Sequence, residues 1–222
     1  ASYPLIGGTL ATFAWHYPFL LPWLAVPLSF LILKFLHNPE PEQKQKLGAY
    51  FKGTWHSMKN RRVFSIFIVG ILVFIILYGS LLTYLSILLG HVFHASSFQI
   101  GAIMFTMSIT TAIVSSQLGK ISKRFAKENL VKFAFLCYVV GLVLILVCPK
   151  LWLFIIPMII IGIGQGLNIP TLQNLLANEA PPEYRAVFMS LNGAMLRTGQ
   201  SLGPPVIALA YTFWSYNGAF LS

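Results

Sequence analysis

The sequence predicts an all-α membrane protein, folded as a bundle of transmembrane helices. Hydrophobic residues make up 57% of the chain and charged residues only 9%, whereas soluble domains carry roughly 25% charged residues. The apolar residues also fall in runs close to the ~20 residues that a helix needs to cross a bilayer. The net charge of +10 does not indicate a nucleic-acid-binding protein, because the basic residues form short clusters between apolar runs.

The apolar runs predict six complete spans and part of a seventh. The complete spans are residues 19–36, 63–89, 98–118, 131–147, 152–176 and 185–213. The run from Tyr3 to Ala14 is too short to cross a bilayer, and the chain begins with Ala1 instead of Met, so we expect a fragment of a longer protein. We also expect kinks at Pro22 and Pro27 in the first complete span, and a break at Tyr78-Gly79-Ser80 in the second.

A polar, basic segment over residues 37–62 fixes the predicted orientation. Basic loops are retained on the cytoplasmic side, and strict alternation of the spans then puts every Lys and Arg except Lys150 in the inner half. Within this segment, residues 43–58 carry apolar side chains at spacings of three and four, which predicts an amphipathic helix on the inner membrane surface. A disordered linker is the alternative.

No residue pattern indicates catalysis, a metal site or a cofactor. Cys137 and Cys148 have no His or acid near them at ligand spacing, and His91 and His94 lack a third ligand. No Ser/His/Asp set or phosphate-binding loop is present either. We therefore predict that the protein is not an enzyme.

Three stretches resemble signatures of one transporter family. Tyr3-Pro4-Leu5-Ile6-Gly7-Gly8 resembles a Gly-Pro-x-x-Gly-Gly signature, with Tyr3 in place of the first Gly. Residues 119–127 resemble a cytoplasmic Gly-x-x-x-Asp-Arg-x-Gly-Arg motif, in which Gly119, Arg124 and Lys127 fit but Lys123 replaces the acid. Residues 162–205 resemble a helix pair with its linking loop, from Gly164-x-Gly166 to Gly203-Pro204.

These stretches identify a resemblance to the major facilitator superfamily, specifically its twelve-helix drug/proton antiporter branch. The resemblance implies three parts: the end of an N-terminal half (1–36), a cytoplasmic linker (37–62), and a C-terminal half without its last helix (63–222). It further implies a multi-pass protein of the plasma membrane that exports small organic molecules in exchange for protons, together with N-terminal helices beyond this chain. Uptake of a sugar or organic acid by symport, and a non-transporting protein on the same bundle, remain alternatives.

In such a transporter, polar side chains inside the spans are candidates for the substrate path. Arg197 follows Arg185 by twelve residues, or about 18 Å of helix. A buried Arg at that depth costs at least ~2.5 kcal/mol, so Arg197 should line a water-filled cavity or a gate, or else bond to backbone carbonyls and lock its helix. Gln200 shares its face, and Asn192 lies on another face.

For two further sets of polar residues, packing between helices is the alternative to a role in the substrate path. Gln165, Asn168 and Thr171 recur every three residues, so they either line a cavity or form bonds between helices. Tyr78 and Tyr84 either stack on an aromatic or cationic substrate or serve packing.

Small residues predict where helices approach each other closely. The pairs Gly7-Gly8, Gly162-x-x-x-Gly166 and Gly199-x-x-x-Gly203 have the spacing of close helix contacts. Gly203-Pro204-Pro205 is expected to interrupt its helix, as a hinge or as a fixed kink.

Overall fold

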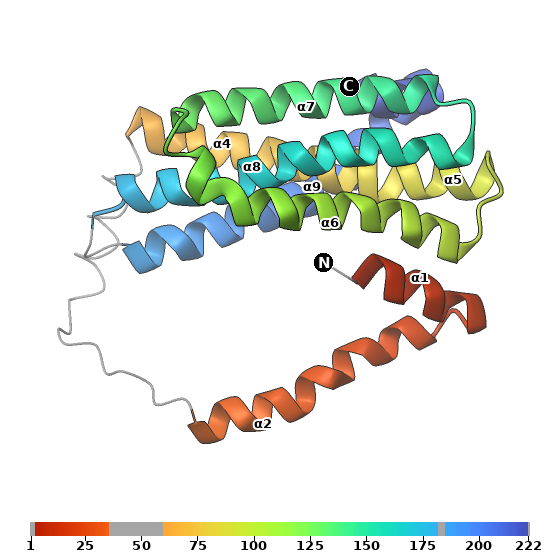
Figure 1. Cartoon of the computed structure of the whole chain (residues 1–222), viewed down its shortest axis with the longest axis horizontal. Coiled ribbons are helices and arrows are strands. Elements are labelled where there is room, and N and C mark those ends of the chain that lie inside the picture. The colour runs from red at the N-terminus through yellow and green to blue at the C-terminus, as the bar shows by residue number, and fades with distance from the viewer. Residues whose placement is uncertain (1–2, 36–59, 182–184, 222) are drawn as a thin grey trace.

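A computed structural model describes residues 3–35, 60–181 and 185–221, and the regular structure in these ranges is helical (Figure 1). The segment predicted as an amphipathic surface helix, residues 43–58, lies outside the described residues. The elements are α1 (Tyr3–Phe13), η1 (Tyr17–Leu24), α2 (Ala25–Phe35), α4 (Arg61–Ile75), η2 (Ile76–Leu85), α5 (Ser86–His91), α6 (Ser97–Ile121), α7 (Lys127–Val147), η3 (Leu151–Phe154), α8 (Ile155–Glu179) and α9 (Arg185–Leu221).

Five helical stretches in the described ranges are long and apolar enough to cross a membrane: Tyr17–Phe35, Arg61–His91, Ser97–Ile121, Lys127–Val147 and Leu151–Glu179. They match the first five predicted complete spans. The sixth predicted span lies within α9, a continuous helix of 37 residues that is not among those five. The prediction of an all-α membrane bundle is confirmed.

Local sequence signals explain where several helices begin. The side chain of Asn60 accepts a hydrogen bond from the Arg62 backbone N–H at 3.0 Å, which caps α4. At the start of α6, Ser96 and Gln99 bond reciprocally to each other's backbone N–H groups and form a capping box. Pro27 lies in the first turn of α2, where its missing N–H costs little.

Helix α8 lies at the centre of the bundle. It packs along both α6 and α7, while α9 packs along α4 and η2. The helix α1 rests on α6, and α2 runs away from the bundle with exposed side chains (Figure 1). The largest buried cluster joins η2, α5, α6, α7, η3 and α8 through residues such as Leu85, Ile103, Tyr138, Phe154 and Ile161.

Most of the described basic residues lie at one end of the bundle, and Arg197, deep in α9, is an exception. The turn between α6 and α7, the start of α4 and the start of α9 all lie at that end, and the turn that holds Lys150 lies at the other (Figure 1). This arrangement is the one that strict alternation of the spans requires. It separates the positive charge as expected for an inner and an outer membrane surface.

The expected break at Tyr78-Gly79-Ser80 is wrong, whereas the kink or hinge expected at Gly203-Pro204-Pro205 stays a prediction. Tyr78-Gly79-Ser80 does not break its helix, because residues 76–85 continue as a π-helix, whose i→i+5 bonding absorbs the irregularity without ending the helix. The Thr83 hydroxyl follows the same spacing and donates to the Tyr78 carbonyl at 2.8 Å. Gly203-Pro204-Pro205 lies inside the continuous helix α9.

Labelling of Cys148 is expected to test the orientation. This residue follows α7 at the predicted outer surface, and burial raises the pKa of its thiol above the usual value. Because the thiolate is the reactive form, a membrane-impermeant maleimide should label it slowly near pH 7 and progressively faster as the pH rises past ~8.5, the usual pKa.

The control is Cys148→Ser, which leaves Cys137 buried within α7 and should abolish external labelling. If Cys148 is labelled only after the membrane is permeabilised, the predicted orientation is reversed.

Candidate functional site

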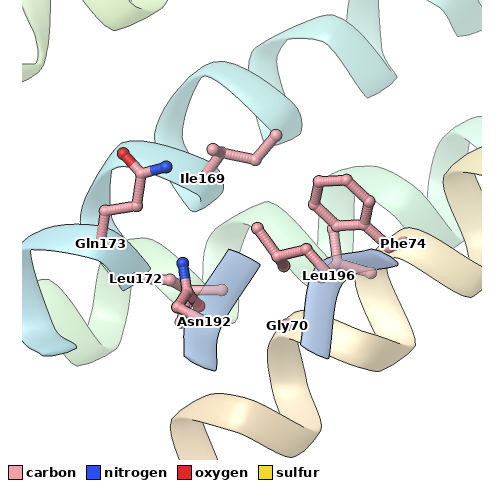
Figure 2. A pocket seen from close by; sticks show the side chains of 8 residues that line it. Gly70, Phe74, Ile169, Leu172, Gln173, Asn192 and Leu196 are labelled. Carbon is pink, nitrogen blue, oxygen red and sulfur yellow. The ribbon is translucent and has the colours of Figure 1, made fainter. Parts of the chain in front are cut away.

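A narrow pocket lies where α4, α8 and α9 meet (Figure 2). Its wall is mostly apolar, and Gln173 of α8 and Asn192 of α9 supply the polar groups; the other lining residues are Gly70, Val73, Phe74, Ile169, Leu172 and Leu196. Figure 2 shows the two amides at the end of the pocket away from Phe74. The space inside is about 10 Å³, room for about one water molecule. The pocket therefore marks where polar groups of two helices meet, but it does not hold an organic molecule.

Gln173 is a residue that the sequence reasoning missed. It is exposed, and it lies inside the predicted span 152–176. Gln173 is out of step with the three-residue repeat that begins at Gln165. The signal that marks it is a polar side chain inside an apolar span.

Arg197 is exposed on α9, and its guanidinium is held by a neutral partner. Its Nη1 donates to Oε1 of Gln200 at 2.7 Å. In the part of the chain that the structure describes, the other Lys, Arg and Glu residues of the long helices lie within about two turns of a helix end. Arg197 is thus a positive charge deep in a helix, and it forms no ion pair with an acid among the described residues.

The exposed surface of α9 divides into two sides. Leu202, Val206 and Leu209 form an apolar side, whereas Arg197 lies on roughly the opposite side of the helix. Apolar side chains suit contact with lipid, but an Arg at this depth is costly there. The side with Arg197 is therefore suited to a water-filled space or to another protein surface.

The stripe on α8 lies between helices. Asn168 and Thr171 are 0% and 2% exposed, and Gln165 is half-buried. The amide N–H of Asn168 donates to the Tyr138 hydroxyl of α7 at 3.4 Å, and the Thr111 hydroxyl of α6 donates to Gln165 Oε1 at 3.5 Å. Gln165 and Asn168 therefore have the arrangement of the interhelical alternative, whereas the Thr171 hydroxyl donates to the Leu167 carbonyl of its own helix.

Pro170 explains a further bond between α6 and α8. A proline has no N–H, so the carbonyl four residues earlier, that of Gly166, loses its helical partner. The Ser115 hydroxyl of α6 donates to this carbonyl at 3.1 Å. A side chain on a neighbouring helix thus satisfies the freed backbone group, as a bilayer requires.

Ser115→Ala is expected to destabilise the protein by about 1 kcal/mol, the order of a hydrogen bond between membrane helices, because the Gly166 carbonyl is then left without a partner. Thermal unfolding in detergent measures this. Ser116→Ala is the matched control, since the Ser116 hydroxyl is exposed and donates only to Ile113 of its own helix. Equal midpoint shifts for the two variants would contradict the assignment.

The two tyrosines pack against other rings. Tyr84 is 9% exposed, with its ring centroid 5.4 Å from that of Tyr211 on α9. Tyr78 is half-buried and stacks on Phe74 at 5.8 Å. Tyr78 and Tyr84 therefore help to join α4 and η2 to each other and to α9.

The glycine pairs lie at close helix contacts. A Cβ atom at Gly162 or Gly166 would come within 2.7 or 2.8 Å of a carbonyl oxygen of α6. A Cβ at Gly199 would lie 2.6 Å from a backbone atom of α4. One at Gly203, the residue before Pro204, would lie 2.9 Å from a backbone atom of η2. On α1, a Cβ at Gly8 would lie 2.5 Å from the Ser97 carbonyl oxygen, whereas one at Gly7 would meet nothing within 4 Å.

The residues of the cytoplasmic motif lie at the turn between α6 and α7. Gly119 and Arg124 are exposed there and Lys127 begins α7. An ion pair at the same end, between Arg62 Nη1 and Glu179 Oε1 at 3.1 Å, joins α4 to α8. No local sequence signal points to this pair, because its members lie 117 residues apart. The Arg62 side chain is 73% exposed, so the pair contributes little stability.

No group of three or more His, Cys, Asp or Glu residues suited to a metal ion is found in the described ranges.

Comparison with known proteins identifies the family. The model of the Major Facilitator Superfamily matches residues 1–204. The chain is 28% identical over 221 residues to a bacillibactin exporter of Bacillus subtilis, covering 92% of this chain and 52% of that protein. It is 24% identical over 228 residues to the multidrug resistance protein MdtG of Salmonella arizonae, covering 98% of this chain and 55% of that protein.

A third relative is the glucose transporter GlcP of Staphylococcus epidermidis, 27% identical over 99 residues, which are 45% of this chain and 22% of that protein. The chain spans about half the length of the exporter and of MdtG. These relatives are named as an exporter, a multidrug resistance protein and a glucose transporter, and they agree with the prediction that the protein is a transporter and not an enzyme. The match over residues 1–204 shows that this chain, a multi-pass membrane protein, belongs to the major facilitator superfamily.

Proposed function

We propose that the protein containing this chain exports small organic molecules across the plasma membrane in exchange for protons, by alternating access. The observation that carries this proposal is Arg197, a charged side chain held by Gln200 on the polar side of α9. A charge at that depth is stable only beside water or polar groups. A transport path through the bilayer supplies such surroundings.

The arrangement of the helices supports a transporter with two halves. Secondary transporters place their substrate between two helical units that rock against each other. In this proposal, residues 1–36 belong to the first unit and residues 63–222 to the second, with the cytoplasmic segment 37–62 between them. The contact of α1 with α6 at Gly8 and Gly101, where a Cβ on Gly101 would lie 2.5 Å from the Pro4 carbonyl oxygen, then joins the two units. Helices beyond this chain complete the first unit.

Export is favoured over uptake because the two relatives that this chain matches over more than nine-tenths of its length are an exporter and a multidrug resistance protein. Proton coupling rests on the resemblance to the drug/proton antiporter branch. Among the described helices, the acids are Glu128 in the first turn of α7 and Glu179 at the end of α8. A proton-binding carboxylate within the membrane would therefore belong to the other half of the protein.

The test is transport by the complete protein in proteoliposomes with and without a pH gradient. We expect a gradient of protons to drive a small organic dye against its concentration gradient, and collapse of the pH gradient with a protonophore to stop it. Transport that is indifferent to the pH gradient contradicts proton coupling. Absence of any transport contradicts the proposed function and favours a non-transporting membrane protein.

Sugar uptake is the second candidate, supported by the relative named as a glucose transporter and by the neutral amides Gln173, Asn192 and Gln200, which suit sugar hydroxyls. Accumulation of radiolabelled glucose or inositol by the same proteoliposomes separates the two candidates. Sugar accumulation without dye export would favour uptake.

A further inference from the structure

The charge on Arg197 is not neutralised by an acid among the described residues. Its hydrogen-bond partner there is the Gln200 amide, 2.7 Å from Nη1, and an amide has no charge. The ion pair that the described residues form is Arg62 with Glu179, near the ends of α4 and α8. A guanidinium has five N–H donors, so Arg197 retains donors and a full positive charge for a further partner.

Gln200 also fixes how the guanidinium is presented. It lies one turn further along α9, and its Oε1 atom accepts from one terminal nitrogen of Arg197. This bond restrains a long side chain that is otherwise free on an exposed surface. A guanidinium held in this way is well suited to two parallel bonds with a planar carboxylate.

Among the described residues no acid lies beside Arg197, because the acids of these helices, Glu128 and Glu179, lie near the ends of α7 and α8. The hydrogen-bond partner of its guanidinium is the neutral amide of Gln200, and Ser201, one turn along α9, is neutral as well. The described part of this half therefore presents one fixed positive charge at depth with neutral hydrogen-bonding groups beside it.

We propose that the substrate is an organic anion, whose acidic group binds Arg197. The inference rests on the proposed function and narrows its substrate class. An anion gains from the fixed charge, and a cation is repelled by it.

The test compares two xanthene dyes of similar size, anionic fluorescein and cationic rhodamine 123, in proteoliposomes of the complete protein. We expect wild type to transport fluorescein at least ten times faster than rhodamine 123. Arg197→Gln should lower the fluorescein rate at least tenfold and leave the rhodamine rate unchanged or higher. Arg197→Lys keeps the positive charge but loses the planar guanidinium with its paired N–H donors. Its fluorescein rate should therefore lie between those of Arg197→Gln and wild type. Arg185→Gln, at the start of the same helix, is the matched control and should keep the preference for fluorescein.

The outcomes separate this inference from the proposed function. If wild type transports rhodamine 123 faster than fluorescein, the inference is wrong and the export function stands. Equal loss of both dyes in Arg197→Gln also overturns it, because Arg197 then acts structurally or pairs with an acid elsewhere in the protein. If neither dye moves, the proposed export function fails together with the inference.

Discussion

Gly166→Val is expected to destabilise the protein by about 3 kcal/mol, at the upper end of the cost of overpacking, and to lower its accumulation in the membrane severalfold. The Cβ of any larger residue at this position would lie 2.8 Å from the Thr111 carbonyl oxygen and 2.8 Å from the Val114 Cβ. Neither atom belongs to the flexible end of a side chain, so α6 and α8 must move apart. The same movement would lengthen the bond from Ser115 to the Gly166 carbonyl. Fluorescence-detected thermal unfolding in detergent measures the change.

The matched control for this variant is Gly193→Val. Gly193 lies in the interior of α9, where an added Cβ would meet no heavy atom within 4 Å. The same gain in side-chain volume should therefore shift the unfolding midpoint far less. Similar shifts for the two valine variants would show that glycine is needed in these helices for backbone flexibility, and that the close contact of α6 with α8 is not the reason.

Arg197→Ala is expected to reduce transport by the complete protein at least tenfold without reducing its accumulation. The Arg197 side chain is exposed and donates to Gln200 of the same helix, so its loss breaks no contact between helices that the structure records. Removal of a charge from this depth also lowers the cost of inserting α9 by ~2.5 kcal/mol or more. The initial rate of transport per molecule of purified protein is the quantity to measure.

Arg185→Ala provides the comparison, because it removes an Arg from the first residue of α9, where a charge can reach the aqueous phase. This variant should retain most of the transport rate. Equal losses of accumulation and transport in Arg197→Ala would instead identify Arg197 as a residue that locks its helix in place.

Several features of this fold were predictable from the sequence because they depend on the membrane alone. An apolar run long enough to cross a bilayer must satisfy its backbone groups within itself, so it forms a helix wherever its neighbours lie. The positions of α6, α7 and α8 follow from this rule. The distribution of Lys and Arg likewise predicted which helix ends lie together.

The details of contact were not predictable, because they depend on which surfaces meet. The stripe of Gln165, Asn168 and Thr171 reads equally well as a cavity lining and as interhelical bonding, and the covering of α8 by both α6 and α7 decides that Asn168 and Thr171 are buried. The π-helix at residues 76–85 is a similar case. Gly79 there packs against Gly203 of α9, with a Cβ position 2.7 Å from the Gly203 carbonyl oxygen, and no local pattern records that partner.

The sequence by itself thus determined the fold class, the apolar segments that cross the bilayer and the family, because hydropathy, charge position and short motifs are properties of single segments. Only the tertiary structure decided which polar groups are already bonded and which remain available. That distinction depends on neighbours far apart in the chain, as with Ser115 and the carbonyl that Pro170 frees. Asn168 of α8 is already bonded to Tyr138 of α7, whereas the charge of Arg197 stays exposed on α9.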